Sequence, residues 1–517
     1  MNIQVKGLTA WWFVPLLSLA SLAAPSSDLR LVEAVKSKDR EAVRSLLKQD
    51  ADLNAPEADG STALAWASHW DDLETADLLI RAGAKVNAAN EYGATPLWMA
   101  CTNGNAAMVE KLLQAGANPN AALTSGETAL IAAVHTGNVD AIKSLLAHGA
   151  DVNAKEIQRA QSALMWAVAE RRLEVARLLI EHGADVHARS KGGFTPLLFA
   201  VAAGDLDLAQ TLLTAGANAN EATPDPDRMS ALLVASAKGH EKIALFLLEK
   251  GADPNATDGK EGYTALHHAA SRRNMLELVK ALLARGANPN ARLVQAPPRP
   301  NDGKGGISLL GATPALLAAV IGNAPAILAL VEGGADPQIG TQGGTTPLLI
   351  VAGVGRNPDL VPTTDQKGRY METAKMLVQL HSDVNAVGDN GWTALHGAAY
   401  TASDEIIEYL AGKGANLNAF DSFGQTPLSI TLTFITAGIG ANFYQAPRAV
   451  HRSTADLLLR LGATPLEASG VKRMDVLPEG LRSGEISPYV RALAAAQEKA
   501  AGSNTDKAAA GTSNKAK

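Results

Sequence analysis

Apolar and polar positions recur along the chain in a unit of about 33 residues. A copy begins with Thr or Ser followed by Pro or Ala and then Leu, as at Thr95-Pro96-Leu97. Thr and Ser are favoured helix N-caps, and proline is tolerated at the first helical position because its missing N–H has no partner there. Apolar residues follow at helical spacing, so each copy predicts a first helix that starts at this motif.

A second amphipathic stretch follows in each copy and ends at a pair of leucines such as Leu112-Leu113. A glycine lies just beyond it and suits the left-handed residue that closes a helix. The Asp/Asn-x-Asn run after the glycine predicts a tight turn. The closing slot holds Gly83, Gly116, Gly149, Gly183, Gly216, Gly251, Gly286, Gly334, Gly414 and Gly462, and degenerate copies place Asp50 and His381 there.

One such helix pair is too small to bury its own apolar face, so neighbouring pairs must stack. The phased motifs, including Thr264-Ala265-Leu266-His267 and Thr393-Ala394-Leu395-His396, resemble the ankyrin repeat family. The resemblance implies an all-α repeat fold, an ankyrin solenoid of about twelve units. Each unit has an inner helix, an outer helix and a protruding β-turn finger. It also implies a protein partner, contacted through the fingers and the C-terminal ends of the inner helices.

The chain begins with a pattern typical of a bacterial secretory signal. Lys6 precedes the apolar run of residues 8–22, and small residues stand before Ala24. We therefore expect a signal peptide at residues 1–23 and export to the periplasm or the extracellular space. A membrane attachment is expected only if the signal stays uncleaved. The solenoid then covers residues 24–465, a C-terminal extension with a short helix covers 466–501, and a disordered tail covers 502–517.

Three copies are about 15 residues longer than the others. The first insertion, between Gly286 and Thr313, lengthens a finger. The second and third, at about residues 354–370 and 433–452, interrupt the link between inner and outer helix on the opposite rim. With helices about 10 Å apart, these two would form walls roughly 20 Å apart. Long loops on a rigid scaffold often carry function, although tolerated insertions are the simpler alternative. The part of the chain that carries these insertions is also similar to a secreted bacterial subgroup of ankyrin proteins.

Aromatic residues gather in the slots that the family uses for binding and in the insertions. Exposed aromatics are common anchors of protein interfaces. We predict the main binding surface at residues 366–445, with Tyr400 between the two walls. The predicted protein-binding residues are Trp70, Tyr92, Phe194, Tyr263, Tyr370, Trp392, Tyr400, Phe420, Phe423, Phe443 and Tyr444.

Composition argues against several other functions. Lys plus Arg is 46 and Asp plus Glu is 52, a net charge of −6, which does not favour nucleic-acid binding. Cys101 is the only cysteine, so there is no disulfide and no cysteine-rich metal site. His267 and His396 are expected to bond local backbone. No catalytic residue, cofactor or metal is predicted.

The favoured hypothesis is an exported scaffold that binds another protein without catalysis. A small-ligand receptor or an enzyme is the second hypothesis, with a site between the second and third insertions. It would need titratable groups that converge, and the candidates there are Asp365, Lys367, Arg369 and His451. A secreted effector directed at a host is the third. Arg171-Arg172 and Arg272-Arg273 are interpreted as solvated edges, with binding of acidic groups as the alternative.

Overall fold

The computed structural model describes residues 28–224, 226–296, 308–356, 362–422, 424–432 and 451–465. They form two compact bodies, an N-terminal body that ends at Gln158 and a C-terminal body that begins at Arg159. The regular structure in the described ranges is 24 α-helices and one short 3-10 helix, with isolated bridges but no named strand. The predicted all-α fold is confirmed. The expected signal peptide, C-terminal extension and tail lie outside these ranges.

The helices come in pairs, which we number as repeats 1 to 12. The odd-numbered helix of each pair is the inner helix and the even-numbered helix is the outer one. The N-terminal body holds repeats 1 to 4, formed by α1 (Arg30–Lys36), α2 (Arg40–Leu47), α3 (Ala63–His69), α4 (Leu73–Arg81), α5 (Pro96–Asn103), α6 (Ala106–Gln114), α7 (Ala129–Thr136) and α8 (Val139–Ala147).

The C-terminal body holds repeats 5 to 12. Its helices are α9 (Ala163–Ala169), α10 (Leu173–Glu181), α11 (Pro196–Ala203), α12 (Leu206–Thr214), α13 (Ala231–Lys238), α14 (Glu241–Glu249), α15 (Ala265–Ala270), α16 (Leu276–Ala284), α17 (Pro314–Val320), α18 (Ala324–Glu332), α19 (Pro347–Ala352), α20 (Thr364–Gln379), α21 (Ala394–Tyr400), α22 (Asp404–Gly412), α23 (Pro427–Leu432) and α24 (Arg452–Arg460).

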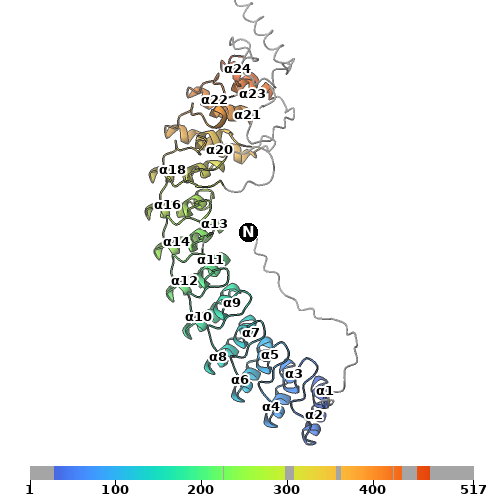
Figure 1. Ribbon diagram of the computed structural model, residues 1–517. Helices are drawn as coiled ribbons and strands as arrows, with labels where there is room; N and C mark the ends of the chain where they lie inside the picture. The colour runs from blue at the N-terminus through green and yellow to red at the C-terminus, as the bar shows by residue number, and fades with distance from the viewer. Residues whose placement is uncertain are drawn as a thin grey trace, which may run out of the picture. The chain divides into compact units, whose positions relative to one another are not determined.

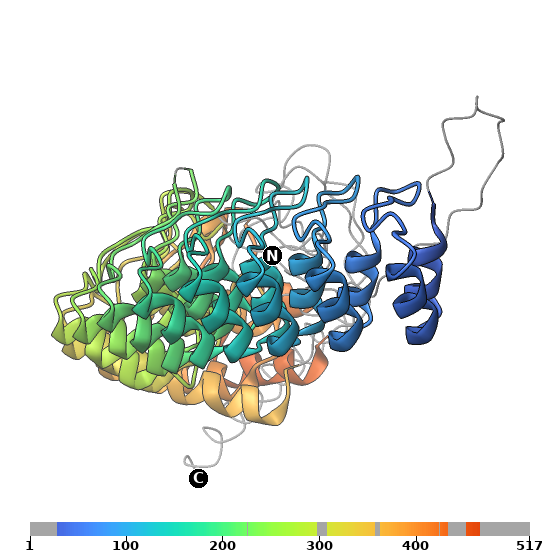
Figure 2. The same ribbon diagram turned by 90° about the horizontal axis from the view of Figure 1, so that it is seen from below.

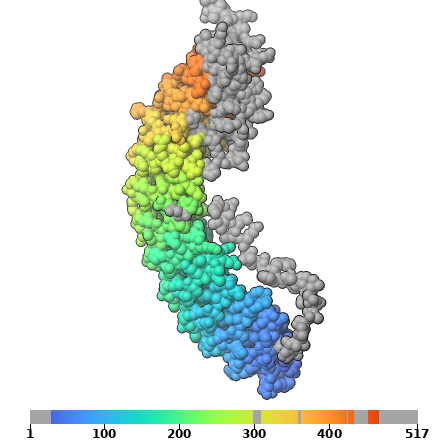
Figure 3. Space-filling view, in the orientation of Figure 1, coloured from blue at the N-terminus to red at the C-terminus, as the bar shows by residue number. Residues whose placement is uncertain are grey.

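Within each body the repeats stack in chain order. Inner helices pack on inner helices, as α5 does on α3 and α7, and outer helices pack on outer helices, as α16 does on α14 and α18 (Figure 1). Along each body the colour in Figure 3 advances repeat by repeat from one end to the other. The core lies between neighbouring repeats and consists mainly of alanine and leucine, such as Ala100 and Leu112.

The caps explain where an inner helix such as α5 begins and ends. The Thr95 hydroxyl accepts a hydrogen bond from the Trp98 N–H at 3.2 Å, and Pro96 stands at the first helical position. Gly104 closes the same helix in the left-handed conformation, with φ of 72°. The predicted Thr-Pro start is therefore confirmed, and a left-handed glycine stops this helix.

The slot that closes each outer helix is also left-handed. Gly116 has φ of +87°. The two degenerate copies follow the same rule although they lack glycine, since Asp50 has φ of +52° and His381 has φ of +63°. The period read from the sequence thus gives the correct phase in every copy of this slot.

Asparagine side chains at the finger bases tie each repeat to the next. In repeat 2, the Asn87 side chain donates to the Gly116 carbonyl at 3.0 Å and accepts from the Asn118 N–H at 2.7 Å. The same pair of bonds is made by Asn120, Asn220, Asn255, Asn290, Gln338 and Asn385. Repeat 5 departs from this rule, because His187 stands in the slot and its Nδ1 lies 2.7 Å from the buried Glu221 carboxylate.

Backbone hydrogen bonds also join neighbouring fingers. In the N-terminal body the Thr124 N–H donates to the Tyr92 carbonyl at 2.9 Å. In the C-terminal body the Ser422 N–H donates to the Asn390 carbonyl at 2.8 Å. Figure 2 shows the fingers extending from the helices to one side in each body. The finger side chains are therefore carried on a linked strip of backbone.

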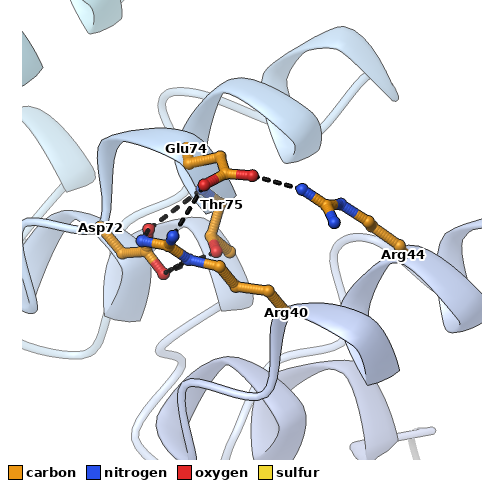
Figure 4. Close-up of polar contacts among 5 residues, drawn as sticks. All are labelled: Arg40, Arg44, Asp72, Glu74 and Thr75. Atoms are coloured by element: carbon orange, nitrogen blue, oxygen red, sulfur yellow. Dashed lines mark hydrogen bonds and ion pairs between the residues drawn. The ribbon is translucent and has the colours of Figure 1, made fainter.

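Repeat 1 lacks the Thr-Pro-Leu start, and α1 has no side-chain N-cap. Ion pairs connect its outer helix, α2, to the next repeat (Figure 4). The Arg40 guanidinium lies 2.7 Å from carboxylate oxygens of both Asp72 and Glu74 in the next repeat, and Arg44 pairs with Glu74. The charges of repeat 1 thus pair along one edge with repeat 2.

The three insertions lie where the sequence predicts them. The first falls in the finger between α16 and α17, the second between α19 and α20, and the third between α23 and α24. Residues 297–307, 357–361 and 433–450 of these insertions are outside the described ranges. The second insertion is not only a loop, because it lengthens α20 to 16 residues, against nine in α18 and α22. Thr363 and Gln366 form a capping box at its start.

Candidate functional site

Three of the predicted binding residues have exposed rings. Tyr92 and Phe420 lie on fingers, and Trp70 directly follows the inner helix α3. These are the positions that the sequence predicts for partner contacts. Phe423, Phe443 and Tyr444 lie outside the described residues.

Trp70 belongs to an ordered aromatic cluster in the N-terminal body. Its ring stacks on Trp66, with the centroids 6.1 Å apart. Lys36 Nζ lies 4.6 Å from the Trp66 centroid and Lys38 Nζ lies 4.9 Å from that of Trp70. Glu57 accepts from Trp66 Nε1 at 2.6 Å and from Lys36 at 2.7 Å. These contacts hold the two rings in place before any partner arrives.

Phe194 and Tyr263 are only half-exposed, because each packs on its own inner helix. Both residues precede the helix N-cap and contact the side chain at the fourth helical position. The Phe194 ring lies 5.8 Å from Phe199, and the Tyr263 ring lies 4.9 Å from His268. This is the hydrophobic staple that fixes the entry of a chain into a helix. Part of each ring is therefore committed to the fold.

Trp392 is buried, so the prediction that it presents an exposed ring was wrong. Its side chain is 3% exposed and packs with Leu349, Val354 and Ile430. Together with Trp392, these residues belong to three successive repeats. Its Nε1 donates to the Asp421 carboxylate at 3.2 Å. The residue before the N-cap turns inward here, and its ring also packs against His396 and Tyr400 of its own inner helix.

Tyr370 and Tyr400 are half-buried and lie in different repeats. Tyr400 ends α21, as predicted, and its ring packs against Trp392 with the centroids 5.3 Å apart. Tyr370 lies on α20, and its hydroxyl donates to the Val320 carbonyl at 3.3 Å. The Arg356 guanidinium lies 3.3 Å from the Tyr370 centroid. Burial lowers the pKa of Arg356 to about 10, so it remains a cation at neutral pH.

Aliphatic finger residues are exposed as well, and a search for aromatics alone misses them. Val387 is 58% exposed and Phe420 is 47% exposed. Both stand two residues after an asparagine of the finger base, at Asn385 and Asn418, in neighbouring repeats. We call Val387 and Phe420 the finger patch. Ile157 and Val294 are also exposed on their fingers. In the sequence, these residues could have been recognised as apolar residues at a repeat position that holds polar or small residues in other repeats.

The four candidates for a catalytic or small-ligand site do not converge. Asp365 pairs with Arg369 one turn away and lies 3.8 Å from Arg273. Among the described residues, neither Lys367 nor His451 bonds to this group, and His451 lies at the start of a different helix, α24. No set of three or more His, Cys, Asp or Glu residues that could hold a metal ion occurs in the described ranges.

The side chains of Cys101, His267 and His396 are buried and serve the fold. Cys101 is buried, and burial raises the pKa of its thiol, so it is a poor nucleophile. His267 Nδ1 accepts from the Thr264 N–H at 3.1 Å, and its Nε2 lies 3.3 Å from the Ala312 carbonyl of the next repeat. Burial lowers the pKa of His267 to about 4. His396 repeats this arrangement, with Gln425 as its acceptor.

A search for membrane-spanning helices, limited to the described residues, finds no helix of the length and apolar character that a bilayer requires.

Comparisons with known proteins match the repeat architecture. A family model of ankyrin repeats in three copies matches residues 31–122, 116–190, 197–293 and 366–433, which together exceed half of the chain. An ankyrin repeat protein of Acanthamoeba polyphaga mimivirus is 32% identical over 89 residues, which are 16% of this chain and only 12% of the viral protein. The crystal structure of the ankyrin repeat domain of Bcl-3, described as a unique member of the IkappaB protein family, aligns at 29% identity. That alignment has a TM-score of 0.38 and covers 41% of this chain and 96% of the Bcl-3 chain.

Proposed function

The chain belongs to the ankyrin repeat family, and we propose that it is an exported, non-catalytic scaffold that binds another protein. Ankyrin repeats generally serve as scaffolds for protein–protein interaction. The observation that carries the proposal is the set of apolar finger side chains held exposed on hydrogen-bonded fingers, above all the finger patch of Val387 and Phe420. Exposed apolar anchors on a rigid backbone lose little entropy on binding.

Among the described residues, Lys367 and His451 do not join Asp365 and its arginine partners, which favours a binding role over catalysis. The ordered cluster around Trp70 supports it too, because Trp rings are enriched at the centres of protein interfaces. The fingers, the inner-helix ends and the insertions together form the proposed contact surface.

The test is recovery of binding partners from exported material with purified wild type and with a double Val387→Ser/Phe420→Ser variant. Leu328→Ser is the control, because Leu328 is also an exposed apolar residue, at 41%, but lies on the outer helix α18. We expect the double variant to lose partners that wild type and the control retain. Equal recovery by all three proteins would contradict the proposed surface.

Export is tested separately by sequencing the N-terminus of the chain purified from its native host. A mature protein that starts at Ala24 and is recovered outside the cytoplasm supports the proposal. A chain that keeps residues 1–23 and stays in the cytoplasm contradicts it.

A further inference from the structure

Exposed cations line the turns between inner and outer helices in repeats 5 to 8 of the C-terminal body. Arg171 follows α9, Lys238 ends α13, and Arg272 follows α15. We call these three residues the basic row. They lie on the rim opposite the fingers, so they are separate from the finger patch.

The two arginines are held at fixed places along this rim. The Arg171 guanidinium donates to the Ala203 carbonyl at the end of α11. The Arg272 guanidinium donates to the Ala237 carbonyl at the end of α13. Each cation therefore covers the C-terminus of a neighbouring inner helix, where the helix dipole favours positive charge. Because α11 and α13 are adjacent, the two guanidinium groups lie about 10 Å apart.

The carboxylates nearest in sequence are engaged elsewhere. Glu170 pairs with Arg172 at 2.9 Å. Asp205 accepts from the Leu208 N–H at 3.0 Å as the N-cap of α12, and Glu241 accepts from the Leu278 N–H at 3.2 Å. Within the described residues, no carboxylate forms an ion pair with Arg171, Lys238 or Arg272, so none of these three cations is neutralised by direct contact with an acid.

His240 lies near these cations, and their charges affect its pKa. Burial lowers the pKa of His240, a hydrogen bond to the Ala202 backbone opposes that shift, and the positive charges of Lys238, Arg171 and Arg272 add to the lowering. All three cations of the basic row thus act on the same imidazole, which indicates that they lie near one another on this rim.

The chain itself brings a carboxylate to the same rim. The lengthened start of α20 extends back over repeat 9, where Tyr370 bonds to the Val320 carbonyl. This extension places the exposed Asp365 carboxylate 3.8 Å from Arg273, the residue next to the last member of the basic row. A carboxylate can therefore approach this rim from solvent. The next positions along the rim are the end of α13, where Arg272 and Lys238 lie together, and the end of α11, which Arg171 covers.

We infer that the basic row binds an acidic, extended peptide segment of a protein partner whose carboxylates recur at about every third residue. An extended chain advances about 3.3 Å per residue, so three residues match one repeat of about 10 Å. Three exposed cations on a chain of net charge −6 are few for nucleic acid, whose binding draws on many phosphate contacts. This inference rests on the proposed function, because it names the chemistry of the protein partner.

The test measures binding of the full chain to a fluorescent 12-residue peptide with glutamate at every third position and serine or glycine elsewhere. Two comparison peptides have the same composition with contiguous glutamates, or glutamine in place of glutamate. The key variant is Lys238→Glu, because Lys238 makes no hydrogen bond or ion pair with other described residues and its loss should not disturb the fold. Lys242→Glu is the matched control, since it makes the same charge change on the outer helix α14.

We expect the spaced peptide to bind wild type best and Lys238→Glu to weaken that binding by about fivefold or more, with Lys242→Glu unchanged. Equal binding of spaced and contiguous peptides would overturn the inference, as would equal effects of the two variants. Equally strong binding of an oligothymidylate of the same charge would overturn it too, by showing a preference for any polyanion. If the peptide fails while the finger variant still loses its partners, only this inference falls and the scaffold function stands.

Discussion

Arg356 stacks on Tyr370, with its guanidinium carbon 3.3 Å from the centroid of the ring. Arg356 follows the inner helix α19 and Tyr370 lies on the outer helix α20, so the contact joins the two described ends of the second insertion. Arg356 also donates to the carbonyls of Ile350 and Val351. The cation thereby ties the end of α19 to the lengthened start of α20.

Replacing Tyr370 tests this clamp. Tyr370→Leu should lower the free energy of unfolding by about 2 kcal/mol, because a desolvated cation loses the face of an aromatic ring. Tyr370→Phe should cost less than about 1 kcal/mol, since it keeps the ring and loses only the bond to the Val320 carbonyl. Urea unfolding of the full chain measures both changes. Equal losses in the two variants would show that the ring face contributes nothing.

Trp392 and Phe420 should respond in opposite ways to truncation. Trp392→Ala should destabilise the protein by about 3–5 kcal/mol, because it empties a buried site shared by three repeats. Phe420→Ala should leave stability nearly unchanged and reduce partner recovery, since its ring is exposed on a finger. Urea unfolding and partner recovery are measured on both variants. A stable Trp392→Ala protein would refute the buried position of that ring.

Stability should fall as the pH drops below about 6.5. His267 is neutral in the folded protein because burial lowers its pKa to about 4, whereas an unfolded histidine takes up a proton near its ordinary value of 6.5. Protonation would also place a proton on Nδ1, which accepts from the Thr264 N–H. The contribution of His267 is complete above pH 6.5 and shrinks by about 2 kcal/mol at pH 5.

The measurement is urea unfolding of wild type and His267→Gln at pH 7 and pH 5. The variant should be less stable at pH 7 but should lose less on acidification. His148→Gln is the comparison, because its exposed ring lies on an outer helix. Identical pH dependence of wild type and His267→Gln would show that His267 is not the group that titrates.

Gly116 allows the cost of its left-handed backbone conformation to be measured without a steric clash from the new side chain. Its φ is +87°, and a Cβ built there meets no atom within 4 Å. Gly116→Ala should therefore cost about 1 kcal/mol through backbone conformation alone. Gly412→Ala is the control, since Gly412 is the last residue of α22, has no positive φ and has open space, so alanine should not destabilise the protein and should stabilise that helix by a fraction of about 1 kcal/mol. Shifts of the same sign in thermal melting would contradict the left-handed assignment.

Much of the fold can be predicted from the sequence because each repeat carries its own local signals. The cap at Thr95, the stop at Gly104 and the left-handed slot at Asp50 all follow from side-chain and backbone preferences within a few residues. The period then supplies the stacking order, because an isolated pair cannot bury its apolar face.

The direction of a finger side chain could not be predicted in the same way. Trp392 and Phe420 both lie on fingers, yet one is buried and the other is exposed. The difference depends on the neighbouring repeats, because Trp392 packs with Leu349 and Ile430 of the repeats on either side and bonds to Asp421 of the next finger. The lengthening of α20 and the convergence of Arg171 and Arg272 on one rim also arise only once the repeats are stacked.

Asn255 ties repeat 7 to repeat 8 and allows the stacking itself to be tested. Its side chain donates to the Gly286 carbonyl at 2.9 Å and accepts from the Asn288 N–H at 2.7 Å. Asn255→Ala removes both bonds and should destabilise the protein by about 2 kcal/mol. Asn255→Asp should be at least as harmful, because the carboxylate keeps an acceptor for Asn288 but faces the Gly286 carbonyl oxygen.

Hydrogen exchange makes this prediction specific to the interface between the two repeats. The Asn288 amide should lose protection in Asn255→Ala, because its acceptor is gone. Asn274→Ala is the control, since Asn274 is exposed and bonds to no other described residue. This control removes an asparagine from the same C-terminal body without affecting the asparagines that link neighbouring repeats. An Asn288 amide that exchanges as slowly in Asn255→Ala as in the control would mean that the side-chain ladder does not hold neighbouring repeats together.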